Sequence, residues 1–566
     1  MVAALLRFAA ATITSVNRLS ALILTLLAFR AALGINLAVH TPAWEAYDEP
    51  FHFAYAAQLA QQGTLPDSSN PMHIHPPAYH ALVAAFMWLS GSARTQLAPP
   101  ERNWYLSEGN GNLNFALPAR TPAQRETERD LSAARLFTAL SALIAAAAAW
   151  RAARAVRLAP AFALMATAFF AFHPQALFSS STVNNDAAAL LIGALIVWCA
   201  CAAVQQRRAH LALTALVLSL IGAAFKLSVL PLSLAACLAL AFCVLWKKLI
   251  AYVLISSGII AIGAFSLRDT GILLPFMTQV HTQSAPVALV QRLTSPLGSI
   301  LLGDALSYGA RSAFGVFGWG MLHLPAWLNI ALWIGVACSL RGTWRVWRLP
   351  LLWLLLCACA SMITAAVALS LLYYNGQLLN SRYLLPSLAA WALLLALSWQ
   401  ALSRLGRYIG ASMVLVLLAT STWLSLGGLA AFYAPPIVFV APSTAEGIQL
   451  TPTIRLRAYE VLSPSVRGGE SLNVALTWQA DGAPTENYTL RLAFIGADGN
   501  IYGWLHTFHG NGRYPTALWR AGTAFREVYR LPIRRDVPAP SVGYLQVMLV
   551  EPSKIVLLDA APIRVR

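Results

Sequence analysis

Long apolar runs constrain this chain more than any other feature of its sequence. Eleven such runs follow one another through the first 432 of its 566 residues, and a helix of about 17–25 apolar residues spans a bilayer. Only 11% of the residues are charged, whereas 58% are apolar. The sequence therefore predicts an α-helical polytopic membrane protein with about 11 transmembrane helices. The predicted spans are approximately 19–39, 131–150, 158–178, 183–204, 209–225, 228–246, 249–266, 325–340, 349–373, 383–402 and 408–432.

Basic residues set the predicted orientation of these spans. The net charge is +17, but Lys and Arg occur in short clusters between apolar runs, so we expect no nucleic-acid partner. If the spans alternate from a cytoplasmic N-terminus, these clusters share the cytoplasmic side and all 22 acidic residues fall on the other side. The positive-inside rule favours this arrangement. The external segments are then 40–130, 267–324, 374–382 and everything after about 433.

The C-terminal part of the chain changes from helical to strand periodicity. Apolar residues alternate with polar or small ones in 472–478, 488–494 and 545–549, and Pro and Gly punctuate the intervals. This pattern is typical of an all-β sandwich. The predicted domains are a transmembrane domain 1–433, a linker 434–445 and an external β-sandwich domain 446–566.

Two adjacent carboxylates leave the first apolar run in the stretch "YDEPFHFAY". Asp48 and Glu49 precede Pro50, which suits the first turn of a helix, and His52 follows four residues after Asp48. If the helix begins that early, Asp48 and His52 share one face. A carboxylate that only caps the helix is an alternative. Because a cap needs one carboxylate and explains neither its neighbour nor the histidine, we predict a functional site here.

Other polar residues gather at the predicted outer ends of the spans, in "MHIHPPAYHAL", "ARLFTAL", "FHPQALFSSSTVNND", "FKLSVLP" and "SRYLLP". Helix capping by Asp and snorkelling of Lys and Arg to the interface are the alternatives for individual residues. Several cations beside carboxylates at one leaflet favour a site for a lipid-linked phosphate. The candidates are His75, His80, Arg135, Asn185, Asp186, Lys226, Arg382 and Tyr383.

A divalent metal ion is an alternative for the same region. Asp48, His52 and His75 are its candidate ligands, because imidazole and carboxylate suit zinc or manganese. Their spacing matches no recognised metal signature. We therefore assign no cofactor from the sequence and leave metal dependence open.

In their order along the chain, these motifs resemble those of the GT-C glycosyltransferases, multi-spanning enzymes that use polyprenyl- or dolichyl-phosphate sugars. The chain looks like the bacterial protein-mannosyltransferase-like and aminoarabinose-transferase-like members over about residues 19–432. The resemblance implies that Asp48 is the catalytic carboxylate, Asp186 the second acidic site and Arg382 a donor-phosphate contact. It also implies a bacterial-type cytoplasmic (inner) membrane, with the active site and the C-terminal domain outside the cytoplasm.

The chemistry of sugar transfer suits the same residues. A polyprenyl phosphate is a good leaving group, so the reaction needs a base for the acceptor hydroxyl and cations for the departing phosphate. We expect Asp48 to be the base in an inverting direct displacement, with Glu49 and His52 orienting either Asp48 or the acceptor. Arg382, with Lys226 or Arg135, would hold the phosphate. The acceptor is a lipid, a glycan or a protein.

Two other functions remain open at this point. A polytopic transporter would also gather charges, but usually near the midplane on helices related by an internal repeat, and we find no repeat. A non-catalytic membrane-anchored surface protein could bind glycans through the tryptophans and histidines of "GWLHTFHGNGRYPTALW", although Trp478 at strand spacing suits a core. The insert 92–130 could contact an acceptor, and a solvated polar loop is the alternative.

Overall fold

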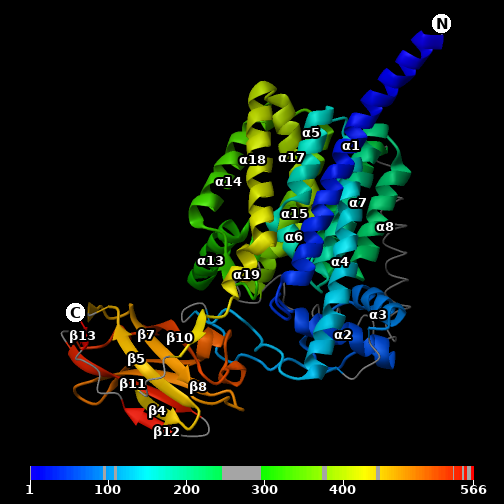
Figure 1. Ribbon diagram of the computed structural model, residues 1–566. Coiled ribbons are helices and arrows are strands. Elements are labelled where there is room, and N and C mark those ends of the chain that lie inside the picture. The colour runs from blue at the N-terminus through cyan, green and yellow to red at the C-terminus, as the bar shows by residue number, and fades with distance from the viewer. Residues whose placement is uncertain are drawn as a thin grey trace.

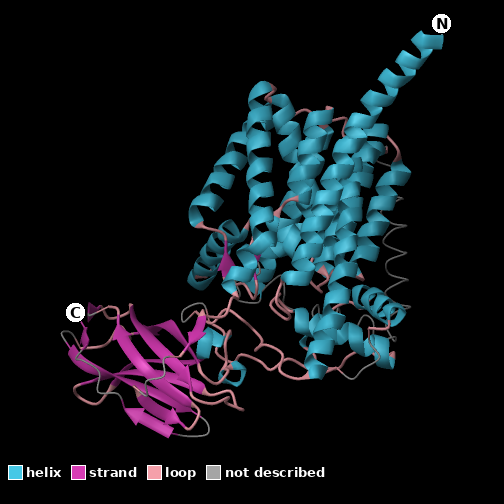
Figure 2. Ribbon diagram, viewed as in Figure 1, coloured by secondary structure: helices cyan, strands magenta, loops and turns pink. Residues whose placement is uncertain are grey.

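The computed structural model describes residues 2–92, 97–107, 111–244, 295–372, 379–441, 446–463, 465–538, 541–550, 554–557 and 563–565. The chain forms a helical domain and a C-terminal β-domain that lies beyond one end of the helices (Figure 1). The N-terminus lies at the opposite end of the helical domain. Figure 2 shows that helices and strands are almost completely segregated between the two parts.

Helices occupy ten of the eleven predicted spans, and the remaining one, 249–266, lies outside the described residues. Six helical segments of the described chain are long and apolar enough to cross a membrane. The chain is therefore a polytopic helical membrane protein, as predicted. The helices are α1 (Val2–His40), α4 (Pro122–Ala155), α5 (Pro160–Ala171), α6 (Pro174–Ser179), α7 (Asp186–Gln206), α8 (Ala209–Ala223), η3 (Leu227–Leu232), α9 (Ser233–Cys243), α14 (Ala326–Leu340), α15 (Pro350–Leu372), α16 (Ser381–Leu384), η7 (Leu385–Ser387), α17 (Leu388–Ala401), α18 (Arg404–Trp423) and α19 (Leu429–Phe432).

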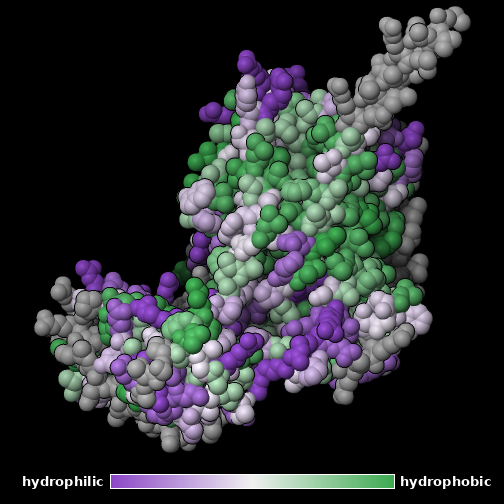
Figure 3. Space-filling view, in the orientation of Figure 1, coloured by the Kyte–Doolittle hydropathy of each residue, from purple (hydrophilic) through white to green (hydrophobic). Residues whose placement is uncertain are grey.

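The surface of the helical domain has the polarity that a bilayer requires. In Figure 3 an apolar band covers the middle of the helices, and polar residues gather at both ends. Loops predicted to be cytoplasmic meet at the end far from the β-domain, where Arg345 Nη1 donates to the carbonyl of Ala401 at 3.0 Å and the backbone N–H of Ala159 donates to Gln400 at 2.8 Å. This polarity and the shared loop end fit the alternating topology.

A close helix crossing brings two distant segments of the chain together. A Cβ atom on Gly193, in α7, would lie 2.1 Å from the carbonyl oxygen of Pro386, in η7. Only glycine allows the backbones to approach this closely. Since α7 begins at Asp186 and η7 directly follows the helix that carries Arg382, this crossing sets the distance between those two charged residues.

The predicted external loop 40–130 contains regular structure. It forms α2 (Glu49–Gln62), η1 (Pro71–Ile74) and α3 (Ala78–Ser90), which pack beneath the helical domain in Figure 1. Leu82, Trp88 and Leu89 of α3 are exposed apolar side chains. An apolar face of this kind suits a helix that lies along a membrane surface.

The end of the second predicted external loop is also ordered. It contains α13 (Pro296–Ser312) and a short antiparallel hairpin of β1 (Val316–Phe317) and β2 (Leu322–His323). The backbone turns through Gly318 and Gly320, both of which have a positive φ that favours glycine. The sequence analysis does not predict this hairpin, because two-residue strands carry no periodic signal.

The β-domain is a sandwich of two sheets around one apolar core, as the alternating pattern predicts. Residues that the sequence analysis assigns to the linker form β3 instead, and β3 pairs with β10 at the edge of the first sheet. In the first sheet the strands are β3 (Val438–Val440), β10 (Thr523–Pro532), β7 (Ser471–Ala480), β5 (Ile454–Val461) and β4 (Ile448–Thr451), in spatial order. The second sheet contains β6 (Ser465–Val466), β13 (Ile563–Val565), β11 (Ser541–Val550), β8 (Thr489–Gly496) and β9 (Ile501–Phe508), with β12 (Lys554–Leu557) on β11.

The insert after α3 docks the β-domain onto the helical domain. Three asparagines of the insert are buried: Asn103, Asn112 and Asn114. This part of the insert is therefore not the solvated polar loop that the sequence analysis gives as an alternative. Asn112 Nδ2 donates to Thr507 at 2.8 Å, and Asn114 Nδ2 donates to the carbonyl of Gly512 at 2.9 Å. The asparagines therefore act as connectors between the domains.

Candidate functional site

Four charged side chains form one continuous network at the end of the helical domain that faces the β-domain. Arg382 Nη2 lies 3.1 Å from Asp48 Oδ2, and Arg382 Nε lies 3.1 Å from Asp186 Oδ2. Lys226 Nζ contacts the other oxygen of Asp186. The network thus joins four of the predicted site residues, which lie far apart in the sequence.

Helix starts position these charges. The backbone N–H of Asp186 donates to Asn184 Oδ1 at 2.8 Å as α7 begins, and that of Arg382 donates to Asn380 Oδ1 at 2.7 Å as α16 begins. In both cases an asparagine satisfies a helix-start N–H. The carboxylate of Asp186 is therefore free to bind cations instead of serving as a cap.

Asp48 is the most accessible member of the network, with 19% of its side chain exposed. It precedes α2 with φ 64°, in the left-handed region, and its side chain makes no capping hydrogen bond. Asp tolerates this conformation better than most residues, but such positions still carry strain. The alternative that Asp48 merely caps the helix therefore does not describe its side chain.

Aromatic rings enclose the cations of the network. The guanidinium carbon of Arg382 lies 4.5 Å from the ring centroid of Tyr47, and Lys226 Nζ lies 5.3 Å from that of Tyr383. Cation–π contacts of this kind hold a cation in a desolvated site. A narrow cleft beside the network is lined by Tyr47, Asp186 and Arg382 together with the hairpin glycines Gly318 and Gly320.

Glu49 and Arg135 form a separate, fully buried ion pair. Arg135 donates to the two oxygens of Glu49 at 2.8 and 2.5 Å, and it also donates to the carbonyls of Thr41 and Pro42. Glu49 additionally accepts the backbone N–H of Val183 at 2.9 Å. Neither partner is free to contact a substrate, so the geometry does not support the predicted catalytic and phosphate-binding roles and gives this pair a structural role.

Three histidines pack behind the network. His52 Nδ1 lies 2.8 Å from His80 Nε2, and the ring of His80 stacks on Tyr55 with a centroid distance of 3.9 Å. His75 Nδ1 lies 3.2 Å from Asn185 Nδ2. Burial lowers the pKa of His75 and of His80 to about 3 and places the pKa of His52 well below its usual value. The three imidazoles are therefore neutral at physiological pH.

Among the described residues, no three or more His, Cys, Asp or Glu side chains are grouped so that they could hold a metal ion. Asp48 turns to Arg382, whereas His52 turns to His80. The structure thus gives no support to a metal held by Asp48, His52 and His75.

Glu45 is a buried carboxylate that the sequence analysis misses. Its oxygens accept the backbone N–H groups of Phe115 and Ala116 at 2.8 and 3.0 Å. Burial raises the pKa of Glu45 to about 8, with a contribution from Glu49, and the two N–H groups and Arg135 oppose this shift only in part. Glu45 ties the loop that carries Asp48 to the docking insert.

Gln175 and Trp319 are also missed, and they fix the hairpin over the site. Gln175 Oε1 accepts the backbone N–H of Val316 at 2.7 Å, and Trp319 Nε1 donates to the carbonyl of Trp44 at 2.9 Å. The ring of Trp319 stacks on Phe115 with a centroid distance of 4.1 Å. The sequence gives little signal for these contacts: Gln175 stands at the start of a helix inside an apolar run, and Trp319 stands between two glycines.

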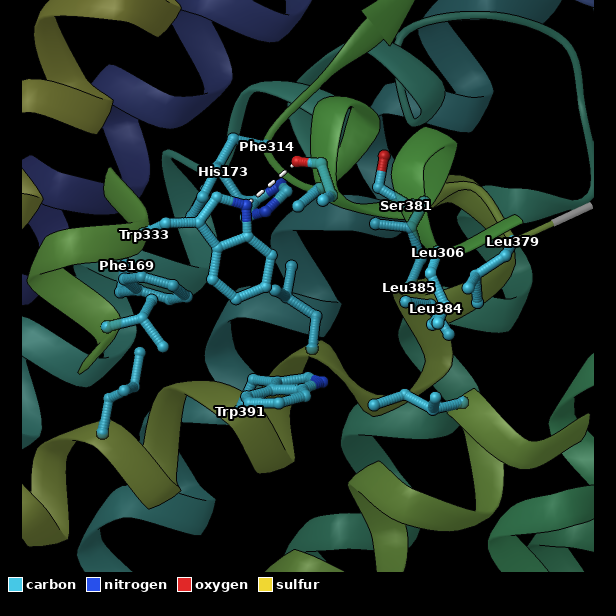
Figure 4. A pocket seen from close by; sticks show the side chains of 17 residues that line it. Phe169, His173, Leu306, Phe314, Trp333, Leu379, Ser381, Leu384, Leu385 and Trp391 are labelled. Carbon is cyan, nitrogen blue, oxygen red and sulfur yellow. Dashed lines mark hydrogen bonds between the residues drawn. The ribbon is translucent and has the colours of Figure 1, made fainter. Parts of the chain in front are cut away.

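An apolar cavity of about 330 Å³ adjoins the network (Figure 4). Aromatic and aliphatic side chains from α5, α13, α14 and α17 surround it, including Trp333, Trp391 and Leu306. Ser381 and Leu384, which flank Arg382 in the chain, also line it. The site therefore combines a charged cleft with an apolar cavity.

The buried pair of Glu49 and Arg135 generates a stability prediction. Glu49→Gln leaves the guanidinium of Arg135 without a counter-charge in the interior, which typically costs about 3–5 kcal/mol. Asp48→Asn, at a partly exposed position, should cost much less. The free energy of unfolding in a detergent titration measures both variants. Equal losses for the two variants would contradict the structural role of Glu49.

The raised pKa of Glu45 generates a pH prediction. In the folded protein the Glu45 carboxyl group stays protonated up to about pH 8, whereas its ordinary pKa is 4.5. The contribution of this proton to the free energy of unfolding is therefore complete below pH 4.5 and is lost as the pH rises through 8. Glu45→Gln removes this titration, although it loses one hydrogen-bond acceptor at every pH. We expect the melting temperature of the variant relative to wild type to rise between pH 6 and pH 9. Glu460→Gln, at an exposed position, is the control. A difference in melting temperature between Glu45→Gln and wild type that stays the same at every pH would contradict the prediction.

Comparisons with known proteins add a distant likeness. No family model and no curated protein sequence matches the chain. Among solved structures, a chain in the cryo-electron microscopy structure of the arabinosyltransferase EmbB from Mycobacterium smegmatis is similar, with 11% sequence identity and a TM-score of 0.29. The match covers 95% of this chain and 63% of the EmbB chain. This chain therefore spans less than two thirds of the length of the EmbB chain.

Proposed function

We propose that this protein is a membrane glycosyltransferase of the GT-C type that moves a sugar from a polyprenyl-phosphate donor to an acceptor hydroxyl. The observation that carries the proposal is the network of Asp48, Arg382, Asp186 and Lys226 beside an apolar cavity. Such a site can bind the two parts of a lipid-linked sugar phosphate, because cations suit its phosphate and the cavity suits its tail. The order of motifs that resembles the GT-C enzymes supports the same proposal.

The cations form the phosphate site in this proposal. Arg382 and Lys226 are both buried, and both are held by Asp186. An Arg fork and a Lys point charge bind phosphate oxygens well, and they do so more strongly when desolvated. A donor phosphate would therefore compete with Asp48 for Arg382, while Asp186 keeps both cations in place.

This competition prepares Asp48 to act as the base. Once Arg382 turns to the phosphate, the carboxylate of Asp48 is released toward the accessible side of the cleft. The acceptor hydroxyl then attacks the anomeric carbon and gives its proton to Asp48. The bond between the anomeric carbon and the phosphate oxygen breaks, and its electron pair leaves with the polyprenyl phosphate, which Arg382 and Lys226 stabilise. One displacement of this kind inverts the anomeric centre.

The apolar cavity suits the donor's isoprenoid chain. Its lining is almost entirely hydrocarbon and aromatic, and it begins at Ser381, beside Arg382. A lipid tail held here would extend from the phosphate into the bilayer between α13, α14 and α17. Because the charged residues stand at helix starts at one end of the helical domain, the arrangement favours an enzyme at the outer membrane surface over a transporter with a midplane site. With the positive-inside rule, this proposal places the site outside the cytoplasm.

The first test removes the proposed base. Purified protein in lipid is offered a panel of polyprenyl-phosphate hexoses and pentoses with lipid, glycan and peptide acceptors, and sugar release and transfer are measured. We expect Asp48→Asn to lower turnover of the accepted donor at least about a hundredfold, which is typical for loss of a general base. Asp304→Asn, an exposed carboxylate on α13, is the matched control. Equal turnover in Asp48→Asn and wild type would remove Asp48 from this role.

A second test fills the proposed lipid cavity. Ala310 lines the cavity and is exposed, so Ala310→Trp should block part of it without unfolding the domain. We expect KM for a long-chain polyprenyl donor to rise about tenfold or more, from the lost burial of several methylene groups. KM for a donor with a short tail and kcat for both should change little. Ala331→Trp, on α14 outside the cavity lining, is the control; an equal effect on both donors would contradict the assignment.

A further inference from the structure

A second cavity lies between the two domains, beside the hairpin. Its volume is about 520 Å³. It is lined by the docking insert, the hairpin strand β2, the end of α19 and one edge of the β-domain. The hairpin glycines Gly318 and Gly320 line the charged cleft, whereas Leu322 of the same hairpin lines this cavity. The hairpin therefore contributes residues to both the cavity and the proposed catalytic cleft.

Asn511 gives this cavity an unused hydrogen-bonding group. The residue is only 8% exposed, and its Oδ1 has no hydrogen-bond partner among the residues that the structure describes. A buried polar atom without a partner is costly, so it marks a place where a ligand can bind. The free group is an acceptor, and it therefore calls for a donor such as a hydroxyl.

Neighbouring contacts hold Asn511 in this position. It has a positive φ of 48° in the turn η9 (His509–Gly512). The carboxylate of Glu527 accepts the backbone N–H of Gly510 at 2.7 Å, and Gly512 accepts from Asn114 at 2.9 Å. The turn is thus fixed from the β-domain core and from the docking insert, as a preformed binding group should be.

Two arginines supply positive charge to the same cavity. Arg513 is anchored by hydrogen bonds to the carbonyls of Gly510 and Phe432 at 2.9 and 3.0 Å. Arg530 lies on the exposed face of β10. The described residues that line the cavity include no carboxylate, so the local charge is positive and suits an oxyanion.

We propose that this cavity binds the acceptor and that the acceptor is an anionic glycan, a sugar chain that bears carboxylate or phosphate groups. Sugar hydroxyls would satisfy Asn511, and the oxyanions would pair with Arg513 and Arg530. The inference rests on the proposed glycosyltransferase function and adds the acceptor class to it. The β-domain then helps to select the acceptor at the edge of the catalytic cleft.

The test measures binding of defined probes to the full-length protein in lipid nanodiscs, without any donor. The probes are an oligogalacturonate, an oligomer of glycerol phosphate bearing sugars, and the carboxyl-reduced neutral form of the first. Isothermal titration calorimetry should show binding of at least one anionic probe and much weaker binding of the neutral one. Which anionic probe binds identifies carboxylate or phosphate as the recognised group.

Variants connect the binding to the cavity. We expect Arg530→Gln and Asn511→Asp each to raise Kd about tenfold or more. Arg530→Gln removes a charge-assisted contact with the probe, and Asn511→Asp adds a carboxylate that repels it. Asp tolerates the left-handed conformation that Asn511 has, so the turn should persist. Arg526→Gln is the matched control, since Arg526 lies on the same strand but pairs with Glu460 at 2.7 Å. Its Kd should stay within about twofold of wild type.

The outcomes separate this inference from the proposed function. Absence of binding by both anionic probes, equal binding of the neutral probe, or equal Kd values in Arg530→Gln, Asn511→Asp and wild type would overturn the anionic acceptor site. Donor turnover could still depend on Asp48 in each of those cases. Conversely, Asp48→Asn should bind the anionic probe with the same Kd as wild type. If donor turnover then proves independent of Asp48, the catalytic proposal fails while the measured binding still stands.

Discussion

The arrangement of the site depends on one interaction, the pairing of the Arg382 guanidinium with two carboxylates. It is buried and lies within 3.1 Å of carboxylates from two other segments, Asp48 before α2 and Asp186 at the start of α7. A buried cation needs paired anions, and removal of one partner is far more costly than at the surface. The loop before α2, α7 and α16 are therefore held together by one side chain, and Gly193 makes the close approach of α7 and η7 sterically possible.

The network is balanced in charge, which explains how four charged side chains can be stable at one buried place. Two carboxylates face two cations, so the resting site requires no external ion. Asp186 contacts both cations, whereas Asp48 pairs with Arg382 alone among the described residues and is partly exposed. Asp48 is consequently the member that can leave the network at the lowest cost. In the proposed reaction, the donor phosphate would replace it on Arg382 without leaving that cation unpaired.

Sequence reasoning predicts the charged network better than its surroundings. Asp48, Asp186, Lys226 and Arg382 all stand at ends of apolar runs, so the predicted topology alone assigns them to one predicted membrane face. The different roles of Asp48 and Glu49 are not predictable, because the left-handed backbone at Asp48 turns adjacent side chains in different directions. The apolar runs and the strand alternation predict the two domains, since both are local periodic signals.

Contacts between distant segments explain what the sequence leaves out. Glu45 and the docking asparagines look like ordinary loop residues, and they are buried only because another part of the chain covers them. Together they form a continuous path from the loop that carries Asp48 to the β-domain. Glu45 holds Phe115 and Ala116, and the neighbouring Asn114 holds Gly512. Each neutral hydrogen bond is worth about 1 kcal/mol, so the path is weak bond by bond but restricts the β-domain at several points. The β-domain and the loop that carries Asp48 thus share one connector, and displacement of the β-domain would act on Glu45, three residues before the proposed base.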